Sequence, residues 1–206
     1  MIDIARQITA IGREVARQPA AGGETVTVRL RRTYDAAVED VWDALTDPDR
    51  IKRWFMPISG ELRVGGTFQL EGNAGGEILT CEPPHAFRVT FGGETSVVEV
   101  RLAADGPGAT VLEMKHTVPI EIAGSGAGAL YVGPGWDGAV LGLSLYLSGQ
   151  TAGGDPVAAA HSPEALAFSK ESVLAWVTAV EKSGTATEEE VAAAQEVSLS
   201  QFAPGH

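Results

Sequence analysis

A strand-like run that changes abruptly into a helical stripe constrains the fold of this chain most strongly. Across residues 25–34 apolar and polar side chains alternate, with Val26, Val28 and Leu30 set against Thr27, Arg29 and Arg31. Period-two alternation predicts a strand with one buried and one solvated face. We assign the three nearby arginines, Arg29, Arg31 and Arg32, to a solvated face.

From residue 38 the apolar period becomes helical, in a stripe made of Val38, Val41, Trp42 and Leu45. Asp47-Pro48 then begins a second short helix, because proline suits the first helical position. That helix ends at Trp54-Phe55. A strand followed by two short helices predicts a curved sheet with helices plugging one end, an arrangement that tends to enclose a cavity.

The middle of the chain carries short strand patterns separated by glycine-containing turns. The predicted strands are residues 67–71, 77–81, 85–91, 96–102 and 110–118. This spacing predicts an antiparallel meander. A glycine-rich, irregular stretch follows at 120–135. Residues 136–147 are apolar on more than one helical face, which predicts a largely buried helix.

Both ends of the chain carry further amphipathic patterns. Ile4, Ile8, Ile11 and Val15 predict one face of an amino-terminal helix, and residues 19–24 read as a linker. A helix start at Ser162-Pro163 and a capping box at residues 187–190 predict two carboxy-terminal helices. Their apolar faces must be buried on the same chain or on a second copy, and we expect a homodimer through these terminal helices.

Charge and cysteine content narrow the class of partner. The 206 residues carry a net charge of -12, which repels phosphate backbones and argues against nucleic acid. Cys81 is the single cysteine and fits a reducing compartment. The longest apolar run, residues 139–147, is too short for membrane insertion, and Asp3 and Arg6 interrupt any signal-peptide core. We therefore expect a cytoplasmic protein.

Four segments together resemble a known family. They are V-W-D-A-L-T-D-P-D-R-I-K-R-W-F at 41–55, R-V-G-G-T-F-Q-L at 63–70, G-G-E-I-L-T-C-E-P-P at 75–84 and G-W-D-G-A-V-L-G-L-S-L-Y-L at 135–147. Through them the chain resembles bacterial relatives of the carboxy-terminal domain of the activator of Hsp90 ATPase, within the START-like, Bet v 1-like (SRPBCC) superfamily. The resemblance implies an α+β helix-grip fold, in which an antiparallel curved sheet wraps around a long helix.

The resemblance covers residues 24–149 and leaves two additions. Residues 1–23 form an amino-terminal helix and linker, and residues 150–206 form a helical extension. The superfamily hosts lipid carriers, hormone receptors, polyketide cyclases and co-chaperone modules, so fold alone does not select a function. We expect a non-catalytic module that binds a small hydrophobic or aromatic ligand between sheet and long helix. The alternatives are a cyclase or aromatase that uses the same cavity, and a co-chaperone-like interaction module that docks through the added helices.

Alternation along residues 111–118 places His116 on the apolar face, together with Leu112 and Met114. A lone histidine there is either a hydrogen-bonded core residue or a ligand contact, and both interpretations stay open. Aromatic and apolar side chains line most ligand pockets. The predicted cavity residues are Trp54, Phe55, Phe68, Phe91, Met114, His116, Tyr131, Trp136 and Val140.

Evidence for chemistry in the sequence is thin. The four histidines, His85, His116, His161 and His206, lack metal-ligand spacing, and neither Ser125 nor Ser144 lies in a G-x-S-x-G elbow. The glycine-rich residues 124–128 lack the surrounding βαβ unit of a dinucleotide site. We expect no metal or cofactor. For the enzyme alternative, Asp137 and Tyr131 at the cavity mouth are the acid–base candidates beside His116.

Overall fold

The computed structural model describes residues 2–150 and 155–205, and residues 151–154 and 206 of the predicted carboxy-terminal extension lie outside this description. The chain divides into two compact units, which we describe separately. Unit 1 comprises Met1–Leu30, Thr117–Val140 and Ala160–His206; unit 2 comprises Arg31–His116 and Leu141–Ala159.

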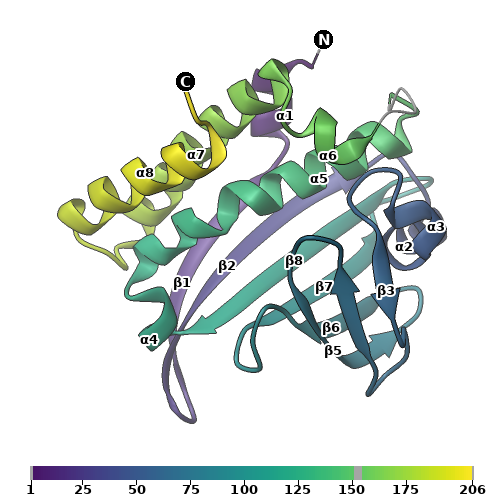
Figure 1. Cartoon of the computed structure of the whole chain (residues 1–206), viewed down its shortest axis with the longest axis horizontal. Helices are drawn as coiled ribbons and strands as arrows, with labels where there is room; N and C mark the ends of the chain where they lie inside the picture. Colours follow the sequence, from purple (N-terminus) through teal and green to yellow (C-terminus); the bar gives the residue numbers. More distant parts are fainter. Residues whose placement is uncertain (1, 151–154, 206) are drawn as a thin grey trace. The chain divides into compact units, whose positions relative to one another are not determined.

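The elements follow one another along the chain, and most of them are labelled in Figure 1. They are α1 (Ile4–Thr9), β1 (Gly12–Ala20), β2 (Gly23–Tyr34), α2 (Val38–Thr46), α3 (Pro48–Ile51), β3 (Ile58–Gly60), β4 (Thr67–Leu70), β5 (Gly75–Glu82), β6 (Ala86–Thr90), β7 (Val97–Ala104), β8 (Thr110–Pro119), α4 (Ile120–Ala123), the 3-10 helix η1 (Gly126–Tyr131), α5 (Gly133–Leu147), α6 (Pro156–Ala159), α7 (Pro163–Ser183) and α8 (Glu188–Phe202). The strands form an eight-stranded sheet in the order β1-β2-β8-β7-β6-β5-β4-β3. The predicted α+β class is confirmed.

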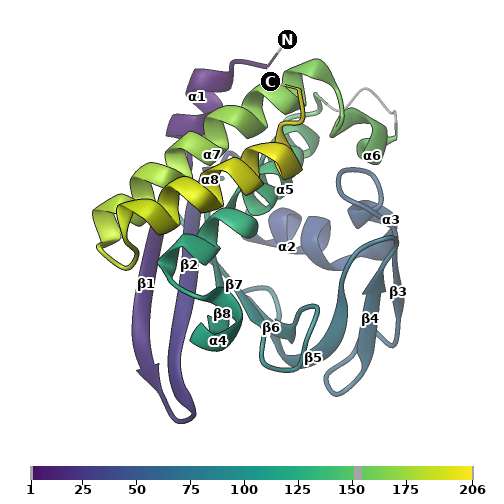
Figure 2. The ribbon, with the colours of Figure 1, turned by 60° about the vertical axis from the view of Figure 1, so that its left-hand side comes forward.

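In unit 2, strands β3 to β7 pair antiparallel with their neighbours in chain order, as the glycine turns predict (Figure 2). Helix α2 buries its apolar stripe, and Trp42 packs edge-on against Phe87 of β6, with ring centroids 6.1 Å apart. The Asp47 carboxylate accepts hydrogen bonds from the backbone N–H groups of Asp49 and Arg50. This cap, followed by Pro48, explains why a second helix, α3, begins directly after α2.

Strand β2 alternates as predicted, but one arginine lies on its buried side. Arg32 is 5% exposed. The solvated-face assignment is therefore wrong for Arg32, because even-numbered positions of this strand point inward with Val28 and Leu30. Within unit 2, Arg32 Nη2 donates to Ser144 Oγ at 2.7 Å, and the guanidinium carbon lies 5.6 Å from the ring centroid of Tyr34.

The amino terminus differs from its prediction. Helix α1 ends at Thr9, and the chain continues as strand β1. The prediction of one helix that carries Ile4, Ile8, Ile11 and Val15 is therefore wrong. The prediction of a linker at residues 19–24 is also wrong, because this segment contains the last residues of β1 and the first residues of β2. The two strands are neighbours in the sheet. Ile11 and Val15 are buried as expected. A spacing of four residues fits one face of a helix and one face of a strand equally well, and pairing with β2 decides for the strand.

The two carboxy-terminal helices of unit 1 begin where their caps predict. Ser162 Oγ accepts from the Ala165 N–H at the start of α7, and Thr187 and Glu190 form the capping box of α8. The two helices pack against each other (Figures 1 and 2). Both also contact η1.

The apolar face of α7 is covered within the chain. Phe168, Val173, Trp176 and Val180 are at most 1% exposed. This face therefore does not need a second copy of the chain to bury it. Among the helices of the described residues, none is long and apolar enough to cross a membrane.

We predict that Trp176→Ala lowers the free energy of unfolding by about 3–5 kcal/mol, because it empties a large, fully buried volume. Leu174→Ala is the control on the same helix, since Leu174 is 39% exposed; its loss should stay below about 1 kcal/mol. Urea unfolding followed by far-UV circular dichroism measures both. Equal losses in the two variants would contradict burial of this face within a single chain.

Candidate functional site

A single row of residues crosses six neighbouring strands, from β3 to β8, and carries the predicted aromatic side chains. Phe68 of β4 lies opposite Gly60 of β3 on one side and Gly76 of β5 on the other. Residues directly opposite each other in antiparallel strands point to the same face. The Ile78–Val89 pairing, continued by the hydrogen bond from Gly92 N to Gly75 O, places Gly76 opposite Phe91.

The row continues to β7 and β8. Phe91 N donates to Ser96 O at 2.9 Å, which places these two residues opposite each other at the β6–β7 turn. The Ser96 hydroxyl then lies 2.8 Å from Nε2 of His116. We call this set the glycine–aromatic row: Gly60, Phe68, Gly76, Phe91, Ser96 and His116.

The rings of the row lie next to one another. The Phe68 and Phe91 centroids are 6.5 Å apart, and Phe91 meets His116 edge-on at 6.0 Å. These distances are typical of favourable aromatic pairs. A groove of about 460 Å³ adjoins the row and is lined by Gly60, Thr67, Phe68, Gln69, Gly75, Gly76 and Gly92. Its volume falls within the usual range for small-molecule sites.

His116 is buried and uncharged at neutral pH. The side chain is 5% exposed, as the alternation of its strand predicts, and burial lowers its pKa to about 4. Because the neutral ring has one acceptor and one donor nitrogen, its bond to Ser96 is satisfied in either tautomer. His116 thus has the hydrogen bond expected of a core residue and also belongs to the aromatic row.

The other predicted cavity residues fall into three places. Met114 is buried on the same face of β8 as His116. Trp54 and Phe55 stack on each other at 5.4 Å just after α3, and Trp54 Nε1 donates to the backbone oxygen of Ala44. Tyr131, Trp136 and Val140 belong to unit 1, where Tyr131 is 42% exposed and Val140 is buried. Within unit 2, the structure therefore brings Phe68, Phe91 and His116 together.

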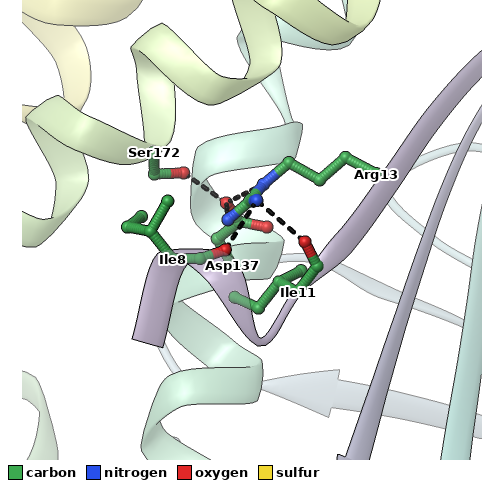
Figure 3. Close-up of polar contacts among 5 residues, drawn as sticks. All are labelled: Ile8, Ile11, Arg13, Asp137 and Ser172. Carbon is green, nitrogen blue, oxygen red and sulfur yellow. Dashed lines mark hydrogen bonds and ion pairs between the residues drawn. The ribbon is translucent and has the colours of Figure 1, made fainter. Parts of the chain in front are cut away.

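Asp137 is not a solvent-facing acid or base, and that expectation is wrong. Its side chain is fully buried in unit 1, and Figure 3 shows its polar contacts. Oδ2 accepts from Arg13 Nε at 2.7 Å and from Ser172 Oγ at 2.5 Å, and Arg13 also donates to the backbone oxygens of Ile8 and Ile11. One carboxylate therefore joins the amino-terminal segment, α5 and α7.

The electrostatics of this cluster follow from its burial. Burial raises the pKa of Asp137, and Arg13, Ser172 and the indole N–H of Trp176 act against that rise. Within the described residues, neither Asp137 Oδ1 nor Trp176 Nε1 makes a hydrogen bond of regular geometry. Arg13 and Asp137 form a close ion pair, with Nη2 2.7 Å from Oδ2. The cluster therefore has a structural role, in which the Asp137 carboxylate is bound by Arg13 and Ser172.

Over residues 2–150 and 155–205, no group of three or more histidine, cysteine, aspartate or glutamate residues could hold a metal ion. His206 lies outside the described residues. Ser125 is engaged as the cap of η1, where its hydroxyl accepts from the Ala127 N–H, and Ser144 accepts from Arg32.

Comparison with known proteins identifies the family. The sequence model described as "Activator of Hsp90 ATPase homolog 1-like protein" matches residues 35–147, which is more than half of the chain. The chain belongs to this family. No curated protein matches the sequence.

Solved structures of family relatives match the fold. The crystal structure of CalU16 from Micromonospora echinospora is 38% identical, with a TM-score of 0.67 over 83% of this chain and 98% of that one. Its solution NMR structure gives a TM-score of 0.70 over 84% and 97%. DynU16, a protein of the dynemicin biosynthetic locus, is 27% identical, with a TM-score of 0.51 over 63% of this chain and 50% of its own. The helix-grip fold predicted from sequence is confirmed, and it is a ligand-binding fold.

Three polar residues that make buried or half-buried contacts in the structure were not predicted from the sequence. Ser96 was read only as the start of a strand, yet its position just after a glycine turn places it opposite Phe91. Arg32 could have been found by extending the alternation of Val26, Val28 and Leu30 by one step. Arg13 carried no usable signal, because its partner Asp137 lies 124 residues away.

We predict that His116→Leu lowers the free energy of unfolding by about 1 kcal/mol at neutral pH, because Ser96 loses its partner but is half-buried and can bond to water. The variant should also lose a pH dependence. The folded-state pKa of His116 is about 4, below its ordinary value of 6.5, so the unfolded state binds more protons between these values. Stability is therefore complete above about pH 6.5 and falls as the pH drops toward about 4.

Between about pH 7.5 and about pH 5 this one group should cost the wild type about 2 kcal/mol relative to the leucine variant. Urea titrations at the two pH values measure the difference. Parallel pH profiles for the two proteins would show that His116 is not held neutral by burial.

For the buried cluster we predict strong non-additivity. Arg13→Met alone leaves the Asp137 charge buried without its cation and should cost about 3–5 kcal/mol. The double variant Arg13→Met/Asp137→Leu removes both charges and should cost clearly less than the sum of the single changes. A double-mutant cycle by urea unfolding tests this, and additive losses would show that the pair is not coupled.

Proposed function

We propose that this protein is a non-catalytic binding module that holds a small hydrophobic or aromatic ligand in the hollow of its helix-grip fold. The glycine–aromatic row beside the groove of about 460 Å³ is the observation that carries the proposal. Predicted contacts are Phe68, Phe91, Met114 and His116 in unit 2. Trp54, Phe55, Tyr131, Trp136 and Val140 remain predicted contacts as well.

The chemistry of the row favours an uncharged ligand. Its side chains are two phenyl rings, a hydroxyl and an imidazole that burial keeps neutral at physiological pH. Burial of apolar surface supplies about 25 cal/mol per Å², from which the cost of ordering the ligand must be subtracted. A net charge of -12 further disfavours anionic ligands and nucleic acid. The proposed setting is the cytoplasm, in keeping with a single free cysteine.

One observation favours a second function, an enzyme of the cyclase or aromatase kind. DynU16 is a protein of a biosynthetic locus, and such a setting favours catalysis on a reactive substrate. Against this stands the low pKa of His116, because a base that binds its proton so weakly removes a proton from substrate inefficiently. Asp137, its predicted partner in acid–base work, is engaged by Arg13 and Ser172.

An interaction role through the added helices has less support. The apolar face of α7 is buried within the chain and is not free to dock a partner. A homodimer through the terminal helices stays a proposal that light scattering tests. A mass near 21.5 kDa at micromolar protein would exclude it.

We predict that the protein purified from its host carries a small apolar molecule, which native mass spectrometry would identify. After solvent extraction of that molecule, the environment-sensitive probe 1-aminoanthracene should bind with increased fluorescence. Phe91→Ala should weaken probe binding about tenfold through lost ring contact. Leu174→Ala, on the surface of α7, is the control and should bind as the wild type does. A protein that carries no ligand and also fails to bind the probe would overturn the binding function.

A further inference from the structure

We infer that the glycine–aromatic row selects a flat aromatic molecule that carries a hydroxyl group, in preference to saturated molecules or unsubstituted aromatics of the same size. The inference rests on the proposed binding function and names the ligand class of that site. It depends on two features of the row, its flat glycine positions and its polar end at Ser96.

The flat part of the row is formed by Phe68 and the glycines on either side of it. Gly60 and Gly76 lie opposite Phe68 on the two adjacent strands, so neither directly paired residue places a side chain beside the ring. A Cβ atom at Gly60 would lie 2.2 Å from Thr67 O, and one at Gly76 would lie 1.9 Å from Thr90 O. Only glycine fits such close backbone packing.

Four glycines and Phe68 form much of the groove wall, which Thr67 and Gln69 complete. Gly60 and Gly76 are two of these glycines, and the groove has a volume of about 460 Å³. A planar ligand can make broad contact with such a surface, while a puckered saturated ring touches it at fewer atoms. Phe91, tilted by 33° to Phe68, supplies a second ring with which an aromatic ligand can form offset or edge contacts.

The polar end of the row is the Ser96–His116 pair. A hydroxyl has one donor hydrogen and two acceptor lone pairs, and the 2.8 Å contact with His116 Nε2 uses one of these capacities. Ser96 is half-buried and lies opposite Phe91, at the end of the aromatic part of the row. It therefore retains capacity to bond with a ligand that stacks on Phe91.

A hydroxyl on the ligand is the group that fits this pair in both tautomers of His116. If Ser96 donates to His116, its lone pairs accept from the ligand hydroxyl. If His116 Nε2–H donates to Ser96, the serine hydrogen is free to donate to the ligand oxygen. A ligand without a polar group would instead cover the Ser96 hydroxyl with apolar surface, and such sites discriminate against ligands that lack the bonding group.

Three probes with one carbon skeleton separate the two features. They are 2-naphthol, naphthalene and decahydro-2-naphthol, the saturated alcohol. We expect the extracted full-length protein to bind 2-naphthol about tenfold more tightly than either of the others, by isothermal titration calorimetry. Equal affinity for the three would overturn the inference while leaving a general apolar binder. Failure of all three to bind would overturn the inference and count against the proposed function itself.

Two variants test the assignment of residues. Ser96→Ala should remove the preference for 2-naphthol over naphthalene and leave naphthalene affinity within about twofold. Phe91→Leu should instead reduce the preference for 2-naphthol over decahydro-2-naphthol. Ser148→Ala is the matched control, because Ser148 is an exposed serine of unit 2 that bonds the Ser144 carbonyl. A Ser96→Ala protein that keeps the full preference for 2-naphthol over naphthalene would show that another residue binds the ligand hydroxyl, and would overturn the assignment of Ser96.

Discussion

The buried carboxylate of Asp137 is the constraint on which the arrangement of unit 1 depends. It receives Arg13 from the first strand and Ser172 from α7, and Arg13 in turn binds two backbone oxygens at the end of α1. Removal of any one partner would leave a charge or a polar group unsatisfied in the interior, which is costly. The amino-terminal and carboxy-terminal segments are therefore held to the start of α5 by charge as well as by apolar packing. That explains why segments far apart in sequence form one unit.

In unit 2 the sheet contains glycines at positions where neighbouring strands approach too closely for a side chain. Gly60 and Gly76, the residues paired directly with Phe68, have no side chains to pack against it. Glycine inside a strand lowers the stability of a sheet. Phenylalanine opposite glycine is also a known way to protect a glycine in a strand. The adjoining groove and the neighbouring Ser96–His116 pair go beyond that protective role and are consistent with a surface shaped for a ligand.

Local pattern was enough to predict most elements, and long-range pairing accounts for the failures. The caps at Ser162 and Thr187 and the alternation that buries His116 depend on near neighbours only, and the structure has all three. Ile11 and Val15 fit a helix or a strand, and only pairing with β2 decided between them. The Arg13–Asp137 pair spans 124 residues, and the Ser96–His116 bond depends on strand register, so neither could be derived from periodicity. The chemistry of the candidate site was harder to predict than its apolar wall for this reason.

The structural match with CalU16 extends beyond the residues that the family model covers. The family model covers only residues 35–147 and includes Asp137 but none of its partners Arg13 and Ser172. The CalU16 crystal structure matches 83% of this chain, which is more than residues 35–147 contain, so the likeness extends into the terminal segments. A buried carboxylate inside the family region, satisfied by residues outside it, requires those outside segments to be present. The segments that carry Arg13 and Ser172 are therefore structural components of this protein and not a detachable tail.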